Sequence, residues 1–364
     1  MDSEAYNRYT YVVSGASRPD HYALPRIVER LGAVGMGEEG TTNELPLDQM
    51  IVRPWSRFCF AAGWLIFASS AFGQAIVLDQ GQFTFGSSYQ HTFVRYHVGF
   101  DGKKADLGHI MSYSIRPEGS YGLTDRITID GDVAFSASKY IGSQPHGRLD
   151  DGTFHSTLQD FHVGVRANWL IRPLYVTPYM RLTVPSHHYE LEGHTATGKG
   201  KLGLTSGLYA GRDFGPFLPN AYFEMMGSHT WVQRTTIDTT SERLNRTNGS
   251  LEFGYYLTPA VTLSAFGIGL RTHGGWELPR RFNNQQELVE HDRFDKSKDV
   301  QLGGTVAYTL RGSLTIYAGY FTTPWARTAH ELAGPTFGFT WSPRRAQPLL
   351  ACSPTRPAML LAQR

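Results

Sequence analysis

Apolar and polar residues alternate along most of the chain after residue 74. In the stretch 126–138, one face of an extended backbone would carry Ile127, Ile129 and Phe135. The opposite face would carry Thr128 and Asp130, followed by further small or acidic residues. Strict alternation over about ten residues predicts a β-strand whose two faces meet different surroundings.

The same alternation recurs at intervals down the chain. We expect strands over the following segments: 160–169, 175–184, 202–211, 221–231, 250–257, 299–310, 314–321 and 336–341. Two segments are irregular, because 261–270 changes phase near Ala265 and Phe266, and 87–94 is ambiguous. We expect β-bulges in both. The total is about 12 strands, an even number such as bacterial barrels have.

The predicted connections alternate between short and long. Short turns are expected at 123–126, 172–174, 215–219, 257–260 and 310–313, and long polar loops at 140–156, 186–200, 235–247, 272–298 and 323–334. Tight turns at one rim and long loops at the other are typical of transmembrane barrels. We therefore predict an all-β chain that forms a transmembrane antiparallel up-and-down β-barrel.

A soluble β-sandwich is the rival fold. Its strands would be nearer 5–6 residues, whereas strands of about ten residues suit a tilted crossing of a bilayer. Aromatic residues also stand near the predicted strand ends, where a membrane barrel carries aromatic girdles. These residues are Tyr121, Tyr140, Trp169, Tyr175, Trp231, Tyr256, Tyr320 and Trp341.

An apolar segment precedes the strands. Arg53 and Arg57 lead into the mostly apolar run 58–71, and Ala71 and Gly73 are small residues directly after it. This order is typical of a secretory signal peptide, and the run is shorter than the roughly 20 residues of a membrane-spanning helix. The strands that follow are therefore expected to belong to an exported protein.

These features predict four parts of the chain. We expect a signal peptide at 50–73, an outer-membrane barrel at 74–342 and a disordered tail at 343–364. A polar stretch in front of a signal peptide would mask it. We therefore interpret residues 1–49 as a non-native or disordered extension that precedes a true start at Met50, with a genuine regulatory extension as the alternative.

Composition narrows the function classes. Only two cysteines occur, Cys59 in the predicted signal peptide and Cys352 in the predicted tail, so we expect no disulfide framework in the barrel. The net charge of +2 gives no indication of nucleic acid as a partner. We predict no cofactor.

The polar strand faces carry charges of both signs that would point into the lumen, since a charge facing lipid is costly. The predicted lumen residues are Arg116, Glu118, Asp130, Asp132, Asp160, His162, Arg166, Arg181, Glu224, Glu252 and Asp299. They would form either a charged pore lining that selects small solutes or a paired network that fills and rigidifies a narrow barrel. The sequence leaves both interpretations open.

Two polar loop segments could carry other chemistry. Segment 187–194 has metal-binding residue types but no fixed ligand spacing, so we predict a solvated loop and no metal site. The charged segment 287–298 is also expected to be solvated, with an inward-folded gate as the alternative. A hydrolase site could also be formed by Asp130, Asp132, Asp160, His162 and Arg166, but no Ser or Asp here has a recognisable hydrolase context. We therefore expect no enzyme.

One motif resembles a known family. The stretch 118–126, Glu-Gly-Ser-Tyr-Gly-Leu-Thr-Asp-Arg, followed by the alternating segment to Lys139, resembles outer-membrane proteins grouped as the "MetA-pathway of phenol degradation" family. The ending 334–341 looks like the closing strand of such barrels, although residues 342–364 follow it. The resemblance implies a porin-like channel, often linked to the breakdown of aromatic or other hydrophobic compounds.

These observations lead to one main functional expectation and two alternatives. We expect an outer-membrane channel of a Gram-negative bacterium for passive passage of small hydrophobic or aromatic solutes. A closed structural or surface-interaction barrel is the alternative, and an outer-membrane hydrolase is the second. The expected partners are outer-membrane lipid, the solute and the barrel assembly machinery.

Overall fold

The computed structural model describes residues 75–169, 174–214, 217–218, 220–237, 240–310 and 313–343. The predicted signal peptide, the extension before it and the tail after residue 343 lie outside these residues. No helix within the described residues has the length and apolar character needed to cross a membrane.

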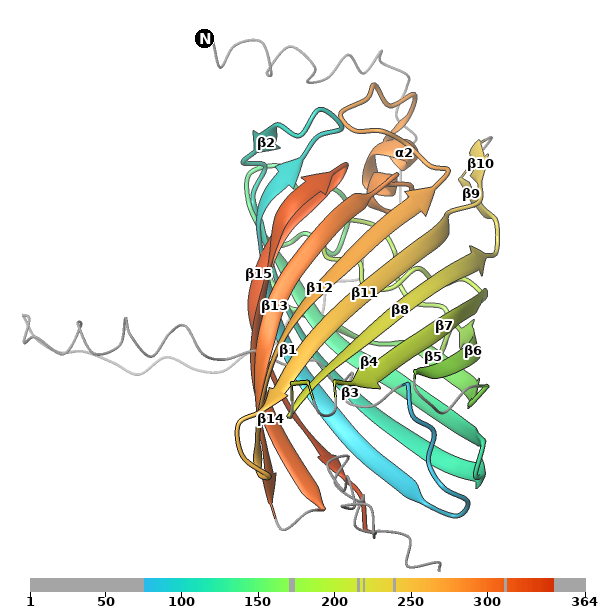
Figure 1. Ribbon diagram of the computed structural model, residues 1–364. Coiled ribbons are helices and arrows are strands. Elements are labelled where there is room, and N and C mark those ends of the chain that lie inside the picture. Colours follow the sequence, from blue (N-terminus) through green and yellow to red (C-terminus); the bar gives the residue numbers. More distant parts are fainter. Residues whose placement is uncertain are drawn as a thin grey trace, which may run out of the picture. The chain divides into compact units, whose positions relative to one another are not determined.

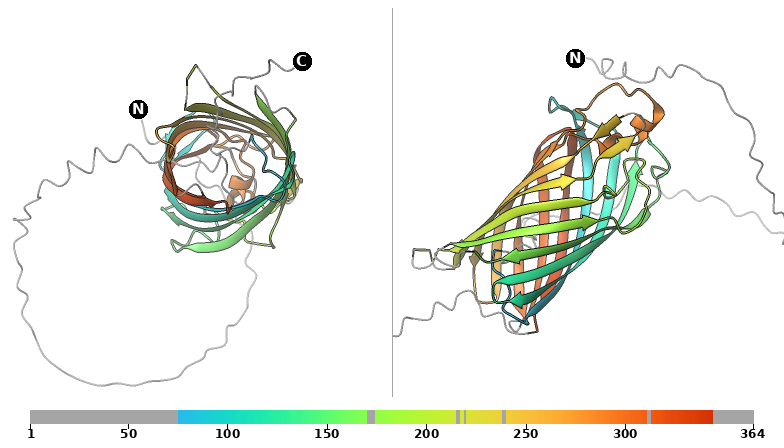
Figure 2. Two further views of the ribbon diagram at one scale, coloured as in Figure 1. Left: turned by 60° about the horizontal axis from the view of Figure 1, so that its bottom comes forward. Right: turned by 90° about the vertical axis from the view of Figure 1, so that its right-hand side faces the viewer.

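Twelve antiparallel strands form a closed barrel (Figure 1 and Figure 2). Each strand pairs with its neighbours along the chain, and the last strand pairs with the first to close the sheet. The barrel strands are β1 (Phe83–Val98), β3 (His109–Thr124), β4 (Ile127–Ile141), β5 (His155–Ala167), β6 (Tyr175–Val184), β7 (Gly203–Asp213), β8 (Ala221–Val232), β11 (Asn245–Tyr256), β12 (Val261–His273), β13 (Lys298–Leu310), β14 (Leu314–Arg327) and β15 (Ala329–Trp341). The predicted all-β, up-and-down barrel is confirmed.

The wall has an apolar outer face and a mostly polar inner face. Phe135 in β4 and Val163 in β5 are 47% and 60% exposed, while Thr128 and Ser138 on the inner face of β4 are fully buried. The alternation in the sequence therefore gives the correct register for these strands, because side chains of successive residues point to opposite faces of a sheet.

Connections are short at one rim and long at the other, with one correction. The predicted loop 323–334 is instead mostly strand: β14 and β15 pair with each other only as far as Thr322 and Ala333, beyond which β14 pairs with β13 and β15 with β1. Only Thr328, with a φ of 46°, separates the two strands along the chain. Pro324 and Pro335 suggest a break in the sequence, but both lie within these strands.

The long-loop rim carries the remaining elements. These are β2 (Lys104–Ala105), which adds to the edge of β1, the hairpin β9 (Thr235–Ile237) and β10 (Thr240–Glu242), and two short helices between β12 and β13: α2 (Gln285–Val289) and the 3₁₀ helix η2 (His291–Arg293). The two short helices lie in a loop, and the barrel wall itself is built of strands.

The predicted bulge in 261–270 is wrong. β12 pairs without a register shift with β11 and with β13 along this segment. The apolar pattern changes phase there because Phe266, Ile268 and Leu270 occupy inner-face positions, in line with the inward Ser264 that bonds Thr305. The strand is therefore regular, and its inner face carries apolar residues along this segment.

Register shifts occur in other strands. They lie in β1 between Val94 and Tyr96, in β3 between Gly122 and Thr124, in β4 between Val133 and Phe135, and in β13 between Val300 and Leu302. The first of these falls at the end of the ambiguous segment 87–94.

Most of the aromatic residues that were predicted for the girdles are exposed. Tyr121, Trp169, Trp231, Tyr320 and Trp341 are at least 40% exposed. Tyr140 is only 1% exposed, because its hydroxyl donates to the Leu107 carbonyl and its ring stacks on His194. Tyr256 occupies an inner-face position and packs against Tyr222. These two tyrosines therefore belong to the interior.

Residues 75–82 cross the lumen at the short-turn rim. The Ala75 backbone N–H donates to Glu224 at 2.9 Å, and the Thr177 hydroxyl donates to the Ala75 carbonyl at 2.5 Å. Leu78 N–H donates to the Thr128 hydroxyl at 2.8 Å. Side chains from three strands therefore hold this segment inside the barrel mouth.

Candidate functional site

Acidic and basic side chains meet on the inner face of four adjacent strands. We call this set the inner charge network, and it consists of Arg116, Glu118, Asp130, Asp132, His162, Arg166 and Arg181. At its centre is Asp132, which accepts from His162 Nδ1 at 2.9 Å and from Arg181. Arg116 Nε lies 3.7 Å from the same carboxylate. One carboxylate therefore meets two arginines and a histidine from three other strands of the network.

A second ion pair lies one step along the same strands. Arg166 Nε donates to Asp130 Oδ1 at 2.8 Å. Gly164 makes this pair possible, since a Cβ at that position would stand 2.5 Å from Asp130 Oδ2. The opposed charges then neutralise each other within the network, as a buried charge requires.

The other predicted lumen residues also lie on inner-face positions, but in separate places. Asp160 is 8% exposed and accepts from Tyr189 OH at 2.5 Å. Glu224 and Glu252 face each other across β8 and β11, and each accepts a different hydrogen bond: Ala75 N–H for Glu224 and Tyr222 OH for Glu252. Asp299 accepts from Gln301 at 3.2 Å. The eleven residues are thus not one constellation.

The wall opposite the inner charge network carries apolar and aromatic side chains. Phe266, Ile268 and Leu270 of β12 are joined there by Tyr317 and Phe321 of β14, which are 6% and 4% exposed. Phe266 lies over Gly303, where a Cβ would be 2.5 Å from its ring. Charged residues are present on this wall as well, since Glu252 is the register partner of Phe266 and Asp299 that of Leu270, so its lining is mixed.

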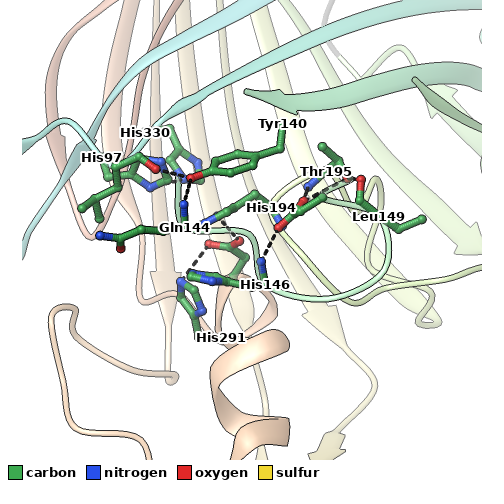
Figure 3. A network of polar contacts seen from close by, with 12 residues as sticks. His97, Tyr140, Gln144, His146, Leu149, His194, Thr195, His291 and His330 are labelled. Carbon is green, nitrogen blue, oxygen red and sulfur yellow. Dashed lines mark hydrogen bonds and ion pairs between the residues drawn. The ribbon is translucent and has the colours of Figure 1, made fainter. Parts of the chain in front are cut away.

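Three histidines from separate loops meet at the long-loop rim, and we call them the loop histidine cluster: His146, His194 and His291 (Figure 3). Their rings are close, with centroids 4.0 Å apart for His146 and His194 and 5.0 Å apart for His146 and His291. His194 is 7% exposed, so the prediction of a solvated loop at 187–194 is wrong for this residue, although His187 and His188 are exposed.

The protonation of these histidines differs with their partners. Burial lowers the pKa of His146 to about 3, and the nearby His194 and His291 add to the effect. Burial would also lower the pKa of His194, but the Asp292 carboxylate outweighs it and holds that pKa above the ordinary value. His194 Nδ1 lies 3.0 Å from Asp292 Oδ2. The cluster therefore combines a neutral imidazole with one oriented by a carboxylate.

The charged segment 287–298 folds inward, which makes the solvated-loop prediction wrong. Phe294 is 0% exposed and stacks on Trp276 with ring centroids 4.5 Å apart. Asn284 caps α2 by accepting from Glu287 N–H at 2.7 Å, and Glu287 itself is 3% exposed. Its carboxylate accepts from Asn283 N–H at 2.9 Å, so the charge is buried with a partner.

Sequence reasoning found the residues of the inner charge network but missed the loop histidine cluster. Alternation predicts which strand residues face inward, whereas no spacing rule links residues 146, 194 and 291. A faint signal is present in Gly147 and Gly193, whose φ values of 104° and 105° allow the two loops to approach each other.

Comparison with known proteins supports the fold. No protein-family model matches the chain, and no curated protein matches it. Among solved structures, an outer membrane channel from Pseudomonas putida F1 superposes with a TM-score of 0.59 at 11% identity, over 74% of this chain and 98% of that one. This likeness extends to the fold alone, and the resemblance to the phenol-degradation family stays a prediction.

Two further solved structures superpose less well. The NanC porin gives a TM-score of 0.42 at 10% identity over 70% of this chain and 98% of that one. The TodX deltaS2S3 mutant, a monoaromatic hydrocarbon channel, gives a TM-score of 0.34 at 9% identity over 74% of this chain and 91% of that one.

Proposed function

We propose that the chain is an outer-membrane channel for small solutes, with a preference for solutes that carry an aromatic or other apolar group. The closed barrel and its exposed apolar outer face support a membrane location, because a barrel without open edges satisfies its backbone hydrogen bonds in lipid. The predicted signal peptide supports export from the cytoplasm.

The lining of the lumen, in which apolar and charged side chains lie together, carries the proposal of solute class. A charge-balanced wall gives polar groups for water and for the polar end of a solute, while Phe266 and Phe321 offer contact for its apolar end. Binding sites for small molecules combine an apolar lining with a few polar groups in the same way.

Planar-bilayer conductance of the full-length chain tests this proposal. We expect discrete channel openings, interrupted more often by benzoate than by gluconate at equal concentration. Phe266→Ser should weaken the benzoate effect, whereas Leu251→Ser, on the outer face of the neighbouring strand, should leave it unchanged. Equal interruption by the two anions would contradict the preference for apolar solutes.

A closed barrel is the second candidate, and the inward-folded loops at the long-loop rim favour it. Phe294 and His194 are buried there, and residues 75–82 cross the opposite rim. A folded, membrane-inserted chain that gives no conductance at any voltage would support this candidate and rule out the channel.

The proposal assigns no catalytic role to the barrel interior. His162 is paired with Asp132, a carboxylate that also receives Arg181. Arg116 also lies beside this carboxylate, whereas a hydrolase needs a nucleophile held against the base.

A further inference from the structure

The loop histidine cluster brings three possible metal ligands to one place. His146 belongs to the β4–β5 loop, His194 to the β6–β7 loop and His291 to η2 in the β12–β13 loop. One ring nitrogen of each lies within 4.8 Å of those of the other two. Figure 3 shows His146 and His291 side by side, with His194 next to His146.

In each of the three histidines, one ring nitrogen remains available for a metal ion. His194 donates from Nδ1 to Asp292, and its buried Nε2 has no hydrogen-bond partner. His291 donates from Nδ1 to the Leu288 carbonyl at 2.6 Å, which leaves the lone pair on Nε2. The buried Nδ1 of His146 also has no hydrogen-bond partner. Unpartnered buried nitrogens are costly and need an explanation.

Backbone contacts hold the three loops in place before any ligand arrives. Asp150 accepts from the backbone N–H of His146 at 2.8 Å and from that of His194 at 3.0 Å. Gly193 N–H donates to the Val289 carbonyl at 2.9 Å, which ties the second loop to α2. The positions of the histidines therefore do not depend on contacts between the imidazoles themselves.

We propose that His146, His194 and His291 bind one divalent transition-metal ion of the class that prefers imidazole, with Zn²⁺ as the best fit. A tetrahedral Zn²⁺ with bonds of about 2.0–2.1 Å to nitrogen needs its ligand nitrogens about 3.4 Å apart. Separations of up to 4.8 Å come into this range by small rotations of the rings. Three protein ligands leave the fourth position open to water or another small ligand.

Asp292 supports this assignment because its carboxylate contacts two of the three histidines. Its Oδ2 orients His194 through Nδ1, the arrangement by which carboxylates fix metal-binding histidines, and its Oδ1 lies 3.4 Å from His291 Nε2. The carboxylate also supplies negative charge beside the cation. Asp292 is thus a positioning residue, and its loss should weaken metal binding about 10–100-fold.

Metal titration of the full-length chain in detergent tests the proposal. Zn²⁺ should bind with one ion per chain in calorimetry, and Co²⁺ should give the strong visible absorption of a tetrahedral site. His146→Ala, His194→Ala and His291→Ala should each lower the Zn²⁺ affinity at least tenfold, and Asp292→Asn should lower it while keeping the stoichiometry. Mg²⁺, which prefers oxygen ligands, should not bind.

The chain offers a matched control in the same loop as His194. The double variant His187→Ala/His188→Ala removes two exposed imidazoles and should bind Zn²⁺ as the unchanged chain does. Folding of every variant is checked by its faster electrophoretic migration before boiling. The proposal would be overturned if the folded, unchanged chain did not bind Zn²⁺. It would also be overturned if the three alanine variants bound Zn²⁺ with the same affinity as the unchanged chain.

Discussion

The inner charge network and the loop histidine cluster are both groups of polar side chains inside the barrel, but they are built differently. The network lies on four adjacent strands, where the backbone ladder fixes which residues face each other. The cluster lies on three loops that are tied by Asp150 and Gly193. In the network Asp130 and Asp132 have cationic partners. In the cluster, by contrast, buried ring nitrogens of His146 and His194 have no hydrogen-bond partner.

This difference teaches how position and reactivity are related in the molecule. Strand register places opposite charges together so that each neutralises the other, which gives stability and a fixed wall. Loop contacts place like groups together and leave their lone pairs unused, which gives a place where a ligand can bind. Mutations in the inner charge network should therefore lower the stability of the whole barrel. Mutations in the loop histidine cluster should affect only the loops.

Asp132→Ala should produce the largest loss of stability. It leaves His162 and two arginines without their shared carboxylate, and breaking a buried ion pair in this way costs about 3–5 kcal/mol. Arg116 and Arg181 have side chains that are 44% and 33% exposed, so water screens part of this loss. We expect about 2–3 kcal/mol in urea unfolding from lipid bilayers.

A surface carboxylate provides the control for that measurement. Asp151→Ala removes an exposed carboxylate in the β4–β5 loop and should leave the free energy of unfolding nearly unchanged. Similar losses in the two variants would mean that the inner charge network does not stabilise the barrel.

Gly164→Ala should have the next largest effect. The added Cβ would stand 2.5 Å from Asp130 Oδ2 and would displace the carboxylate that pairs with Arg166. Overpacking of this kind costs about 1–3 kcal/mol. The matched change Gly227→Ala, a strand glycine with nothing within 4 Å of the new Cβ, should be nearly neutral in the same unfolding assay.

Asp150→Asn should act on the loops and leave the barrel intact. It weakens the acceptor that joins His146 to His194, and such charge-assisted hydrogen bonds contribute about 1.5–3 kcal/mol. We expect about tenfold faster amide hydrogen exchange in these two loops, with the melting temperature of the barrel unchanged. A fall in global stability as large as that of Asp132→Ala would remove the distinction between the two regions.

Acid should loosen the packing of the segment around α2. We expect this effect to be smaller than those of the three substitutions above. Burial raises the pKa of Glu287, but hydrogen bonds from Asn283 outweigh it and hold that pKa below the ordinary value. A carboxyl group with a depressed pKa stabilises the fold at pH values above its unfolded-state pKa. This contribution is lost as the pH falls below about 4.

Tryptophan fluorescence can follow that loosening, because Trp276 is buried against Phe294 and Arg280 in the same segment. The signal of Trp276 should change as the pH falls, and Trp276→Phe identifies its share of the total. In Glu287→Gln the acid response should be absent. An unchanged acid response in that variant would show that another group causes it.

The strand half of the structure could be predicted from the sequence, and the loop half could not. In β4 and β5 the two faces differ so strongly that the alternation fixes both the strand and its register. In β12 the same rule failed, since Phe266 and Leu270 face the lumen, and an apolar lumen wall looks like a change of phase. Alternation shows only which residues are polar. It predicts which side chains point into the lumen only where the residues that line the lumen are polar.

The loops depend on contacts between residues far apart in the chain. Asp150 meets His194 across 44 positions, and His194 meets Asp292 across 98. A local pattern carries no information about such contacts, so charged and histidine-rich loops look solvated. Segment 323–334 was predicted as a loop, but most of it is strand that pairs with β13 and β1, and such pairing is also not visible in a local pattern.

The closing pair of β1 and β15 also limits how this barrel can change during evolution. The two strands run antiparallel because the number of strands is even. Loss of a single strand would make the closing pair parallel, with slanted and slightly less stable hydrogen bonds. Insertions and deletions in the gene are therefore expected to add or remove whole hairpins, so that related barrels differ in circumference by steps of two strands.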